Sequence, residues 1–417
     1  ERVGITDNFF QLGGHSLLAV RLASQLEKLF DQSIPLRAIL AAPTISEQVE
    51  FLQKNTSHAP IFKEITPDIE NQYEPFPLTD IQQAYWIGRS SDFELGNIST
   101  HIYLEVPIFD ADVAKMQRAL NRLIERHGVL RMIVNSDGQQ QILESVPEYQ
   151  LKRYDLTALS DMDAENGILA VREELSHQVL PTDRWPLFDF RLSELSNQRA
   201  IFHASVEVLL LDGASMEIFS KEFFMLYLNP EQEMTPLNLS FRDYVLAEKA
   251  LVTQPIYQKS KSYWMARIND FPSKPALPLA VDPAHIKEPR FERREHIVDA
   301  KQWKHLKNIA QSYQLTPTTL LLGCMGEVLN KWSEQSHFVL NLTLFNRLPF
   351  HTQVNNILGD FTSLTLLEMD ERNPHTVFVD RLRAIQEQGA SDGDNRYFGG
   401  VAVELALRME TGHAANL

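Results

Sequence analysis

The chain has 417 residues, of which 44% are hydrophobic, and a formal net charge of −16. This length allows two or three domains with substantial cores. The acidic balance argues against nucleic-acid binding, because phosphate contacts need clustered Lys and Arg. No apolar run reaches the roughly 18 residues that a membrane helix needs, and the N-terminus lacks the charged-then-apolar pattern of a signal peptide.

Cys324 is the single cysteine of the chain, so an internal disulfide and a cysteine pair for zinc are both excluded. Apolar neighbours on either side predict a buried core thiol and not a nucleophile. His101 and His203 have no spacing partner for a metal, and we expect both to be satisfied structural residues. The composition therefore predicts no metal site and fits a protein of the reducing cytoplasm.

A glycine pair followed by a serine opens an amphipathic helix near the N-terminus. Ser16 comes directly after Gly13-Gly14-His15. The following leucines share one helix face: Leu18, Leu22, Leu26 and Leu29. The helix start offers free N–H groups and a positive dipole end, which suit a phosphate diester. The alternative is that Ser16 is an ordinary N-cap.

The string Asp7-Asn8-Phe9-Phe10-Gln11-Leu12-Gly13-Gly14-His15-Ser16-Leu17-Leu18 resembles the attachment motif of peptidyl carrier proteins in nonribosomal peptide synthetases. The resemblance implies that Ser16 carries 4′-phosphopantetheine, attached by a phosphopantetheinyl transferase. We expect residues 1–54 to be a small helical-bundle carrier whose first helix is missing. It would contain a short apolar segment, Ile34–Leu40, and a helix capped by Thr44 or Ser46. Residues 55–74 are polar, contain two prolines and predict a linker.

From Pro75 the pattern predicts a larger domain with mixed layers. Helices are predicted at 79–89, 112–127, 214–228, 241–268, 300–313, 316–332 and 374–388. Strands are predicted at 100–106, 129–134, 139–143, 200–211, 293–298, 337–344 and 361–368. Strands interleaved with long helices indicate the α/β class.

Segments spread over residues 75–417 resemble, in order, the motifs of heterocyclization domains, a branch of the condensation-domain family. They are Phe76–Arg89, His101–Glu105, Arg126–Arg131, Leu180–Phe188, Ser240–Tyr244, Tyr263–Trp264, Asn341–Arg347 and Gly359–Thr362. The last one, Gly-Asp-Phe-Thr, separates heterocyclization domains from ordinary condensation domains. The resemblance implies a V-shaped pair of chloramphenicol-acetyltransferase-like lobes with α+β layers. We expect them at residues 75–270 and 271–417, the second lobe being truncated.

The resemblance also implies a reaction. In that family the amine of a carrier-bound Cys, Ser or Thr attacks an upstream acyl thioester. The side chain then cyclises onto the new amide, and loss of water gives a thiazoline or oxazoline. Partners would be an upstream adenylation or acyl-loading domain and downstream adenylation and carrier domains. Two alternatives stay open: condensation without cyclisation, and a degenerate, non-catalytic docking scaffold.

The stretch Val206–Ser215 stands where ordinary condensation domains carry a histidine pair, and no such pair is present. Heterocyclization domains have Asp-x-x-x-x-Asp-x-x-Ser here. Asp212 and Ser215 match this pattern, but Glu207 replaces the first Asp. A lone ionised carboxylate in an apolar strand costs several kcal/mol, so Glu207 must be paired or protonated. Pairing with an arginine is one interpretation, and a displaced catalytic carboxylate is the other.

The family pattern suggests an Arg131–Asp212 salt bridge that braces the junction between the lobes, and Ser215 is either a site residue or the N-cap of the following helix. Asn346 ends an apolar strand, where its amide can donate to a developing oxyanion or hold a hemiaminal hydroxyl. The alternative is a turn-forming Asn. Asp360 and Thr362 are expected to support a tight bend.

Family segments that are thought to supply a Thr/Asp pair for dehydration would follow Leu417, the last residue of the sequence. We therefore expect the 417-residue chain alone not to cyclise its substrate. This prediction concerns the isolated chain and not the longer synthetase to which the motifs point.

Overall fold

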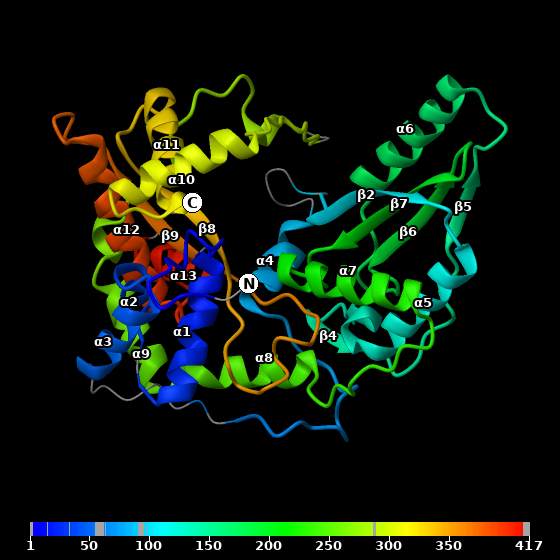
Figure 1. Ribbon diagram of the computed structural model, residues 1–417, viewed down its shortest axis with the longest axis horizontal. Helices are drawn as coiled ribbons and strands as arrows, with labels where there is room; N and C mark the ends of the chain where they lie inside the picture. Colours follow the sequence, from blue (N-terminus) through cyan, green and yellow to red (C-terminus); the bar gives the residue numbers. More distant parts are fainter. Residues whose placement is uncertain are drawn as a thin grey trace.

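The computed structural model describes residues 3–14, 16–32, 34–54, 62, 64–90, 96, 98–286 and 289–411. A small group of helices at the N-terminus lies against one of two larger lobes, and helix α8 runs between the lobes at their base (Figure 1). Each lobe combines a sheet with covering helices, as the predicted mixed layers require. No described helix is long and apolar enough to cross a membrane.

The N-terminal helices are α1 (Ser16–Phe30), α2 (Leu36–Ala41) and α3 (Ile45–Lys54). The apolar segment expected at 34–40 is thus largely the short helix α2. Thr44 caps α3, because its Oγ1 accepts from the Glu47 amide at 3.3 Å while the Glu47 carboxylate accepts from the Thr44 amide at 3.0 Å.

The predicted leucine face of α1 is only partly correct. Among the side chains of this helix that the structure describes, Ala19 and Ala23 are buried, with Leu22 and Leu26 packed beside them. Leu18 and Leu29 are exposed, because the small bundle closes on its alanines.

The first lobe is built on a sheet in the order β2-β7-β6-β5. Its strands are β2 (His101–Phe109), β5 (Lys152–Asp155), β6 (Phe188–Glu194) and β7 (Arg199–Glu207). Helices α5 (Val113–Arg126), α6 (Asp161–His177) and α7 (Gly213–Leu228) cover it (Figure 1). The strand expected at 200–211 ends at residue 207, and β5, α6 and β6 were not predicted.

Alternation along β6 and β7 sorts the two faces of this sheet. Phe190 stacks on Phe202 and on Phe219 of α7, within the largest apolar core. The opposite face carries Arg191, which forms a 2.8 Å ion pair with Glu174 of α6. The sheet therefore has an apolar side toward α5 and α7 and a polar, buried side toward α6.

The second lobe contains the antiparallel pair β8 (His337–Phe345) and β9 (Thr362–Asp370). Its helices are α9 (Pro255–Met265), α10 (Ala300–Ser312), α11 (Pro317–Trp332), α12 (Phe378–Asp394) and α13 (Gly400–Thr411). The strand predicted at 293–298 is wrong: these residues have no strand partner, and Ile297 is exposed. Helix α13 was not predicted.

The helix predicted at 241–268 is interrupted. It consists of α8 (Phe241–Ala250), a 3-10 turn (Leu251–Thr253) and α9. Pro255 lacks the N–H that a continuous helix would need and instead begins α9, where that donor is not required.

The prediction of a buried Cys324 is wrong, because the thiol is exposed on α11. The face that packs inward contains Gly323 and Gly326, where a Cβ would lie about 2 Å from Leu382 and Met369. The glycines, and not the cysteine beside them, therefore bring α11 against the core.

Further elements precede β2 or follow α5 in the chain. They are β1 (Phe76–Pro77), α4 (Asp80–Gly88), β3 (Met132–Val134) and β4 (Gln139–Ile142), with a 3-10 turn at Gly128–Arg131. The strands pair in the order β1-β4-β3. The segment predicted as one strand at 129–134 is thus a turn followed by a short strand.

Candidate functional site

The end of β7 in the first lobe meets the ends of β8 and β9 in the second lobe. Three backbone-centred bonds join these segments: the Asp212 amide donates to the Gly359 carbonyl at 3.1 Å, the Phe361 amide donates to Asp212 Oδ2 at 3.2 Å, and the Asn346 amide donates to the Phe361 carbonyl at 2.9 Å. The structure therefore brings together the predicted residues Asp212, Asn346 and Asp360, which are far apart in sequence.

Asp212 is buried and caps α7. Its Oδ1 accepts from the Ser215 amide at 2.6 Å, and its Oδ2 accepts from the Phe361 amide. A carboxylate at a helix N-terminus is stabilised by the free N–H groups and by the helix dipole. Both oxygens of Asp212 are thus engaged by backbone donors from the two lobes.

The predicted Arg131–Asp212 salt bridge is wrong. The Arg131 guanidinium instead donates to the backbone carbonyls of Ile124, Glu125 and Leu143. The arginine beside Asp212 is Arg347, whose Nη2 lies 3.6 Å from Oδ1. It directly follows Asn346 in the quoted Asn-Arg pair, so the sequence contained the signal, although only the fold shows which arginine reaches the carboxylate.

Arg347 connects several parts of the junction. Its Nη1 donates to the carbonyls of Val354 and Ile357 at 2.7 and 2.8 Å, and its Nη2 donates to Ser215 Oγ at 2.7 Å. The guanidinium also lies over the Phe361 ring, 3.9 Å from its centre. A planar group with five donors suits this role, which a lysine would fill only in part.

Ser215 is not the N-cap, because Asp212 occupies that position. Its Oγ donates to the Gly359 carbonyl at 2.7 Å and accepts from the Gly359 amide at 3.1 Å. Ser215 therefore holds the glycine that begins the Gly-Asp-Phe-Thr segment. A Cβ at Gly359 would lie 2.3 Å from the Phe241 ring, so only glycine fits there without a shift.

Asn346 is buried directly after β8, and its backbone is fully used. Its backbone carbonyl accepts from the Tyr244 hydroxyl at 2.7 Å, and its backbone N–H donates to the Phe361 carbonyl. The side-chain amide makes no hydrogen bond with any described residue. A fixed backbone with an uncommitted amide is suited to bind a polar group of a substrate.

Glu207 is paired, as one of the two interpretations predicted. Arg89 Nη1 lies 2.7 Å from its Oε2, and Ser99 Oγ donates to the same oxygen at 2.5 Å. Arg89 also donates to the Leu180 carbonyl. The arginine is the last residue of the quoted 76–89 motif, a signal that sequence reasoning did not connect with Glu207.

Asp360 is fully buried and supports the bend before β9. Its Oδ1 accepts from the Thr362 amide at 3.0 Å, and its Oδ2 has no hydrogen-bond partner among the described residues. Burial, together with the nearby carboxylates of Asp212 and Glu248, raises the pKa of Asp360 to about 7. Burial, together with the carboxylate of Asp80, raises the pKa of Glu248, on α8, to about 7. Sequence reasoning missed Glu248.

The two single histidines behave as structural residues. His203 is buried, with its ring nitrogens 2.8 Å from the Tyr103 hydroxyl and 2.9 Å from Ser193 Oγ. Burial lowers the pKa of His203 to about 4. The ring of His101 contacts the Ser99 carbonyl at 3.2 Å. Within the described residues, no group of three or more metal-binding side chains gathers.

Ser16 is the first residue of α1, and the loop before it is shaped by its glycines. Gly13 has a φ of +101°, and the Gly14 amide donates to the Phe9 carbonyl at 2.9 Å. A Cβ at Gly14 would lie 2.4 Å from the Phe9 ring. The first turn of α1 holds no acidic residue, so the tight loop and the helix N-terminus fit a phosphodiester on Ser16. The Ser16 side chain itself lies outside the described atoms.

Comparison with family models gives two matches. Residues 72–408 match the condensation domain, and residues 1–52 match the phosphopantetheine attachment site. These two matches lie in the same order as the two sequence resemblances.

Several curated relatives are large proteins of which the chain spans a small part. It is 37% identical to bacitracin synthase 1 of Bacillus licheniformis, over 99% of the chain and 8% of that protein. It is 34% identical to pyochelin synthetase PchF of Pseudomonas aeruginosa, over 84% of the chain and 19% of that protein. It is 30% identical to phenyloxazoline synthase MbtB of a Mycobacterium species (strain MCS), over 94% of the chain and 34% of that protein.

Among solved structures, the EpoB cyclization-docking bidomain from Sorangium cellulosum is similar in fold. A monoclinic form superposes with a TM-score of 0.78 at 33% identity, covering 91% of this chain and 76% of that one. This similarity confirms the predicted pair of lobes.

Proposed function

The chain belongs to the condensation-domain family of nonribosomal peptide synthetases, and on that premise we propose that its larger domain is a heterocyclization domain. The phosphopantetheine attachment segment precedes it, with Ser16 as the residue that carries the arm. In the proposed reaction an amine forms a C–N bond to the carbonyl carbon of an upstream thioester, and the thiol leaves. The Cys, Ser or Thr side chain then adds to the new amide, and its former carbonyl oxygen leaves as water.

Three observations support cyclisation over condensation alone. The stretch Val206–Ser215 lacks a histidine pair, and the Gly-Asp-Phe-Thr segment is present. In the structure that segment is built into the junction, bonded to Asp212 and Ser215. Similar proteins include a phenyloxazoline synthase and a cyclization-docking bidomain.

The observation that carries the proposal most directly is the uncommitted amide of Asn346 at the meeting point of the lobes. We assign it to the hydroxyl or oxyanion of the tetrahedral intermediate that precedes loss of water. The oxygens of Asp212, the Ser215 hydroxyl and the paired oxygen of Glu207 are already bonded to protein groups. Because these groups are already bonded, we assign them to holding the junction in place and not to direct contact with the reacting atoms.

The partners follow from the same premise. Adenylation or acyl-loading domains would supply the donor, and an adjacent adenylation and carrier pair would supply the acceptor. A phosphopantetheinyl transferase would load Ser16. Because two tethered substrates meet at a fixed site, much of the acceleration would come from positioning and raised effective concentration.

The test is a product analysis in a longer synthetase that contains this chain, with loaded donor and acceptor carriers. Intact mass of the acceptor carrier distinguishes the outcomes, because the heterocycle is one water lighter than the linear amide. A product that is one water lighter supports the proposal. A linear amide alone would assign condensation without cyclisation, and no transfer at all would assign a docking scaffold.

A further inference from the structure

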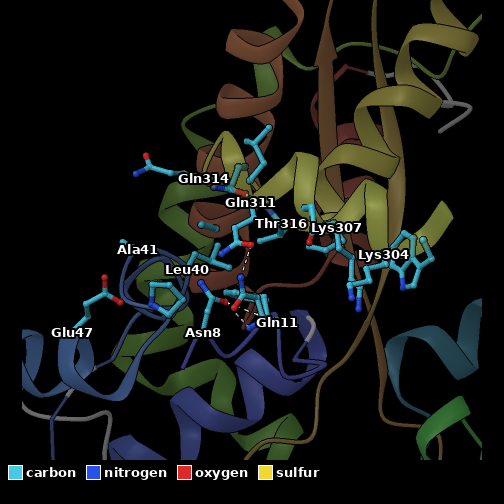
Figure 2. A pocket seen from close by; sticks show the side chains of 18 of the residues that line it. Asn8, Gln11, Leu40, Ala41, Glu47, Lys304, Lys307, Gln311, Gln314 and Thr316 are labelled. Atoms are coloured by element: carbon cyan, nitrogen blue, oxygen red, sulfur yellow. Dashed lines mark hydrogen bonds between the residues drawn. The ribbon is translucent and has the colours of Figure 1, made fainter. Parts of the chain in front are cut away.

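A groove of about 1100 Å³ separates the N-terminal helices from the second lobe (Figure 2). Two contacts hold its walls together at the sides: the Leu36 amide donates to Asp394 Oδ1 at 2.7 Å, and Gln11 Nε2 donates to Gln311 Oε1 at 2.5 Å. The carrier segment therefore rests on α10 and α12 in a defined position that leaves a space between them.

The α10 wall of this groove is basic. Lys304 and Lys307 are three residues apart, so they share one helix face, and neither forms an ion pair with any described residue. Two unpaired lysines side by side are notable in a chain of net charge −16. Of the two carboxylates in the lining, Glu47 lies at the opposite end of the groove in Figure 2 and is bonded to Thr44, and Glu387 belongs to α12.

The rest of the lining suits an extended chain that carries amides. Trp303 is half-buried beside the lysines, and apolar residues such as Leu40 and Leu315 lie further along. Amide side chains, Gln311 and Gln314 among them, supply donors and acceptors between the apolar surfaces. The groove thus combines cations at one end with amide and apolar contacts along its length.

The other wall belongs to the loop that leads into the attachment residue. Asn8, Phe10 and Gln11 line the groove, and Ser16 follows five residues after Gln11. Helix α10 extends from this place toward the first lobe (Figure 1). An arm attached to Ser16 would therefore start a few residues from this wall of the groove.

We infer that this groove holds the 4′-phosphopantetheine arm of the same chain, with Lys304 and Lys307 binding its phosphodiester and Trp303 packing against its pantetheine portion. The inference rests on the proposed loading of Ser16. The resting place lies outside the junction of Asp212 and Asn346, so the arm would be held there between deliveries. The lysines would bind the phosphate as point charges, and their effect would weaken with salt.

The test uses the full chain with a fluorescent pantetheine arm loaded on Ser16, and the readout is the fluorescence anisotropy of the probe at low salt. Lys304→Gln/Lys307→Gln is expected to lower the fraction of slowly rotating probe by roughly fivefold, since each exposed charge contact contributes modestly. Lys301→Gln is the matched control: Lys301 lies on the same helix but does not line the groove. It should leave the anisotropy unchanged.

Two failures are distinguishable. If intact mass shows that Ser16 takes up no arm, the proposed loading is wrong and the groove assignment falls with it. If the arm is loaded but the Lys304/Lys307 variant has the same anisotropy as the Lys301 control, the groove assignment alone is overturned. The ³¹P line width of the unlabelled loaded chain repeats the comparison without a fluorophore, and it should narrow only in the double variant.

Discussion

The lobe junction and the groove beside α2 are held together in contrasting ways. At the junction, buried charged groups are bonded to both lobes. The single side chain of Arg347 contacts Asp212, Ser215 and the carbonyls of Val354 and Ile357. Where the N-terminal helices meet the second lobe, the contacts include a backbone amide on a carboxylate, an exposed pair of glutamines and the Leu36 side chain against Gly393. The difference indicates that the junction is preorganised by buried charged groups, whereas fewer polar contacts hold the N-terminal helices to the second lobe.

The largest effect is expected at Glu207. Arg89→Ala would leave a buried carboxylate with only Ser99 as a partner, so the free energy of unfolding should fall by about 3–5 kcal/mol. Urea unfolding measures this loss. Arg89→Lys keeps the positive charge beside Glu207 but loses the second nitrogen, which donates to the Leu180 carbonyl. Its unfolding free energy should therefore fall by less. A loss below about 1 kcal/mol for Arg89→Ala would mean that this ion pair does not hold the junction.

A smaller loss, about 2–3 kcal/mol, is expected for Arg347→Ala, because Asp212 keeps its two backbone donors. Hydrogen exchange should show faster exchange at the amides of Gly359 and Phe361. Arg131→Ala is the control, since that guanidinium binds carbonyls away from Asp212. If Arg131→Ala increased hydrogen exchange at those two amides to the same extent, that result would support the Arg131–Asp212 salt bridge, which the structure does not contain.

The acids beside the junction should make stability depend on pH. The folded pKa of Asp360 is raised to about 7 from an ordinary 3.8, so the folded state binds the proton more tightly. Its contribution to stability is complete below about pH 4 and is lost as pH rises through about 7. Asp360→Asn should therefore flatten the decline in unfolding free energy between pH 5 and pH 8 by on the order of 2 kcal/mol.

Glu248 is a second acid with its pKa raised to about 7, and Glu248→Gln should flatten the same decline. Because the Glu248 carboxylate also contributes to the raised pKa of Asp360, the two effects are not expected to add. Urea unfolding at the two pH values gives the slopes. A slope unchanged by both substitutions would show that neither carboxyl is protonated in the folded protein near neutral pH.

The smallest effect is expected at the carrier contact. Asp394→Ala removes the acceptor of the Leu36 amide and should increase hydrogen exchange in α2 several-fold, with less than about 0.5 kcal/mol of change in the stability of the lobes. Asp380→Ala is the matched control on α12, because its carboxylate pairs with Arg383 of the same helix. Equal exchange in the two variants would show that α2 is not held by this bond.

Local patterns predicted several helices of this chain well, but not α6 or α13. Helix α5 was predicted within a residue at each end, because Asp112 caps it and its apolar residues repeat at helical spacing. Strand β6 was missed although its residues alternate as in a half-buried strand, with Phe188, Phe190 and Leu192 on one face. What the sequence does not show is that Arg191 and Ser193, on the other face, are buried against partners from other elements. Segment 293–298 failed because only its last two residues, Ile297 and Val298, favour a strand, and no strand among the described residues pairs with it.

The site shows the same division. The resemblance to heterocyclization domains singled out Asp212, Ser215 and Asn346 as site residues and Asp360 as part of a tight bend, and the structure brings them to one junction. The arginines were not predicted correctly, because a long side chain reaches its partner through tertiary packing and not through spacing. Arg347 lies beside Asp212 where Arg131 was expected. Arg89 is the arginine that pairs with Glu207, which one interpretation expected without naming it.

Asn346→Ala in the longer synthetase tests whether the Asn346 side-chain amide serves ring formation. Product mass on the acceptor carrier gives the ratio of heterocycle to linear amide. We expect this ratio to fall by about 100-fold or more, while the linear amide still forms and the folded lobes stay stable. A variant that makes the heterocycle as well as the unmodified enzyme would contradict it.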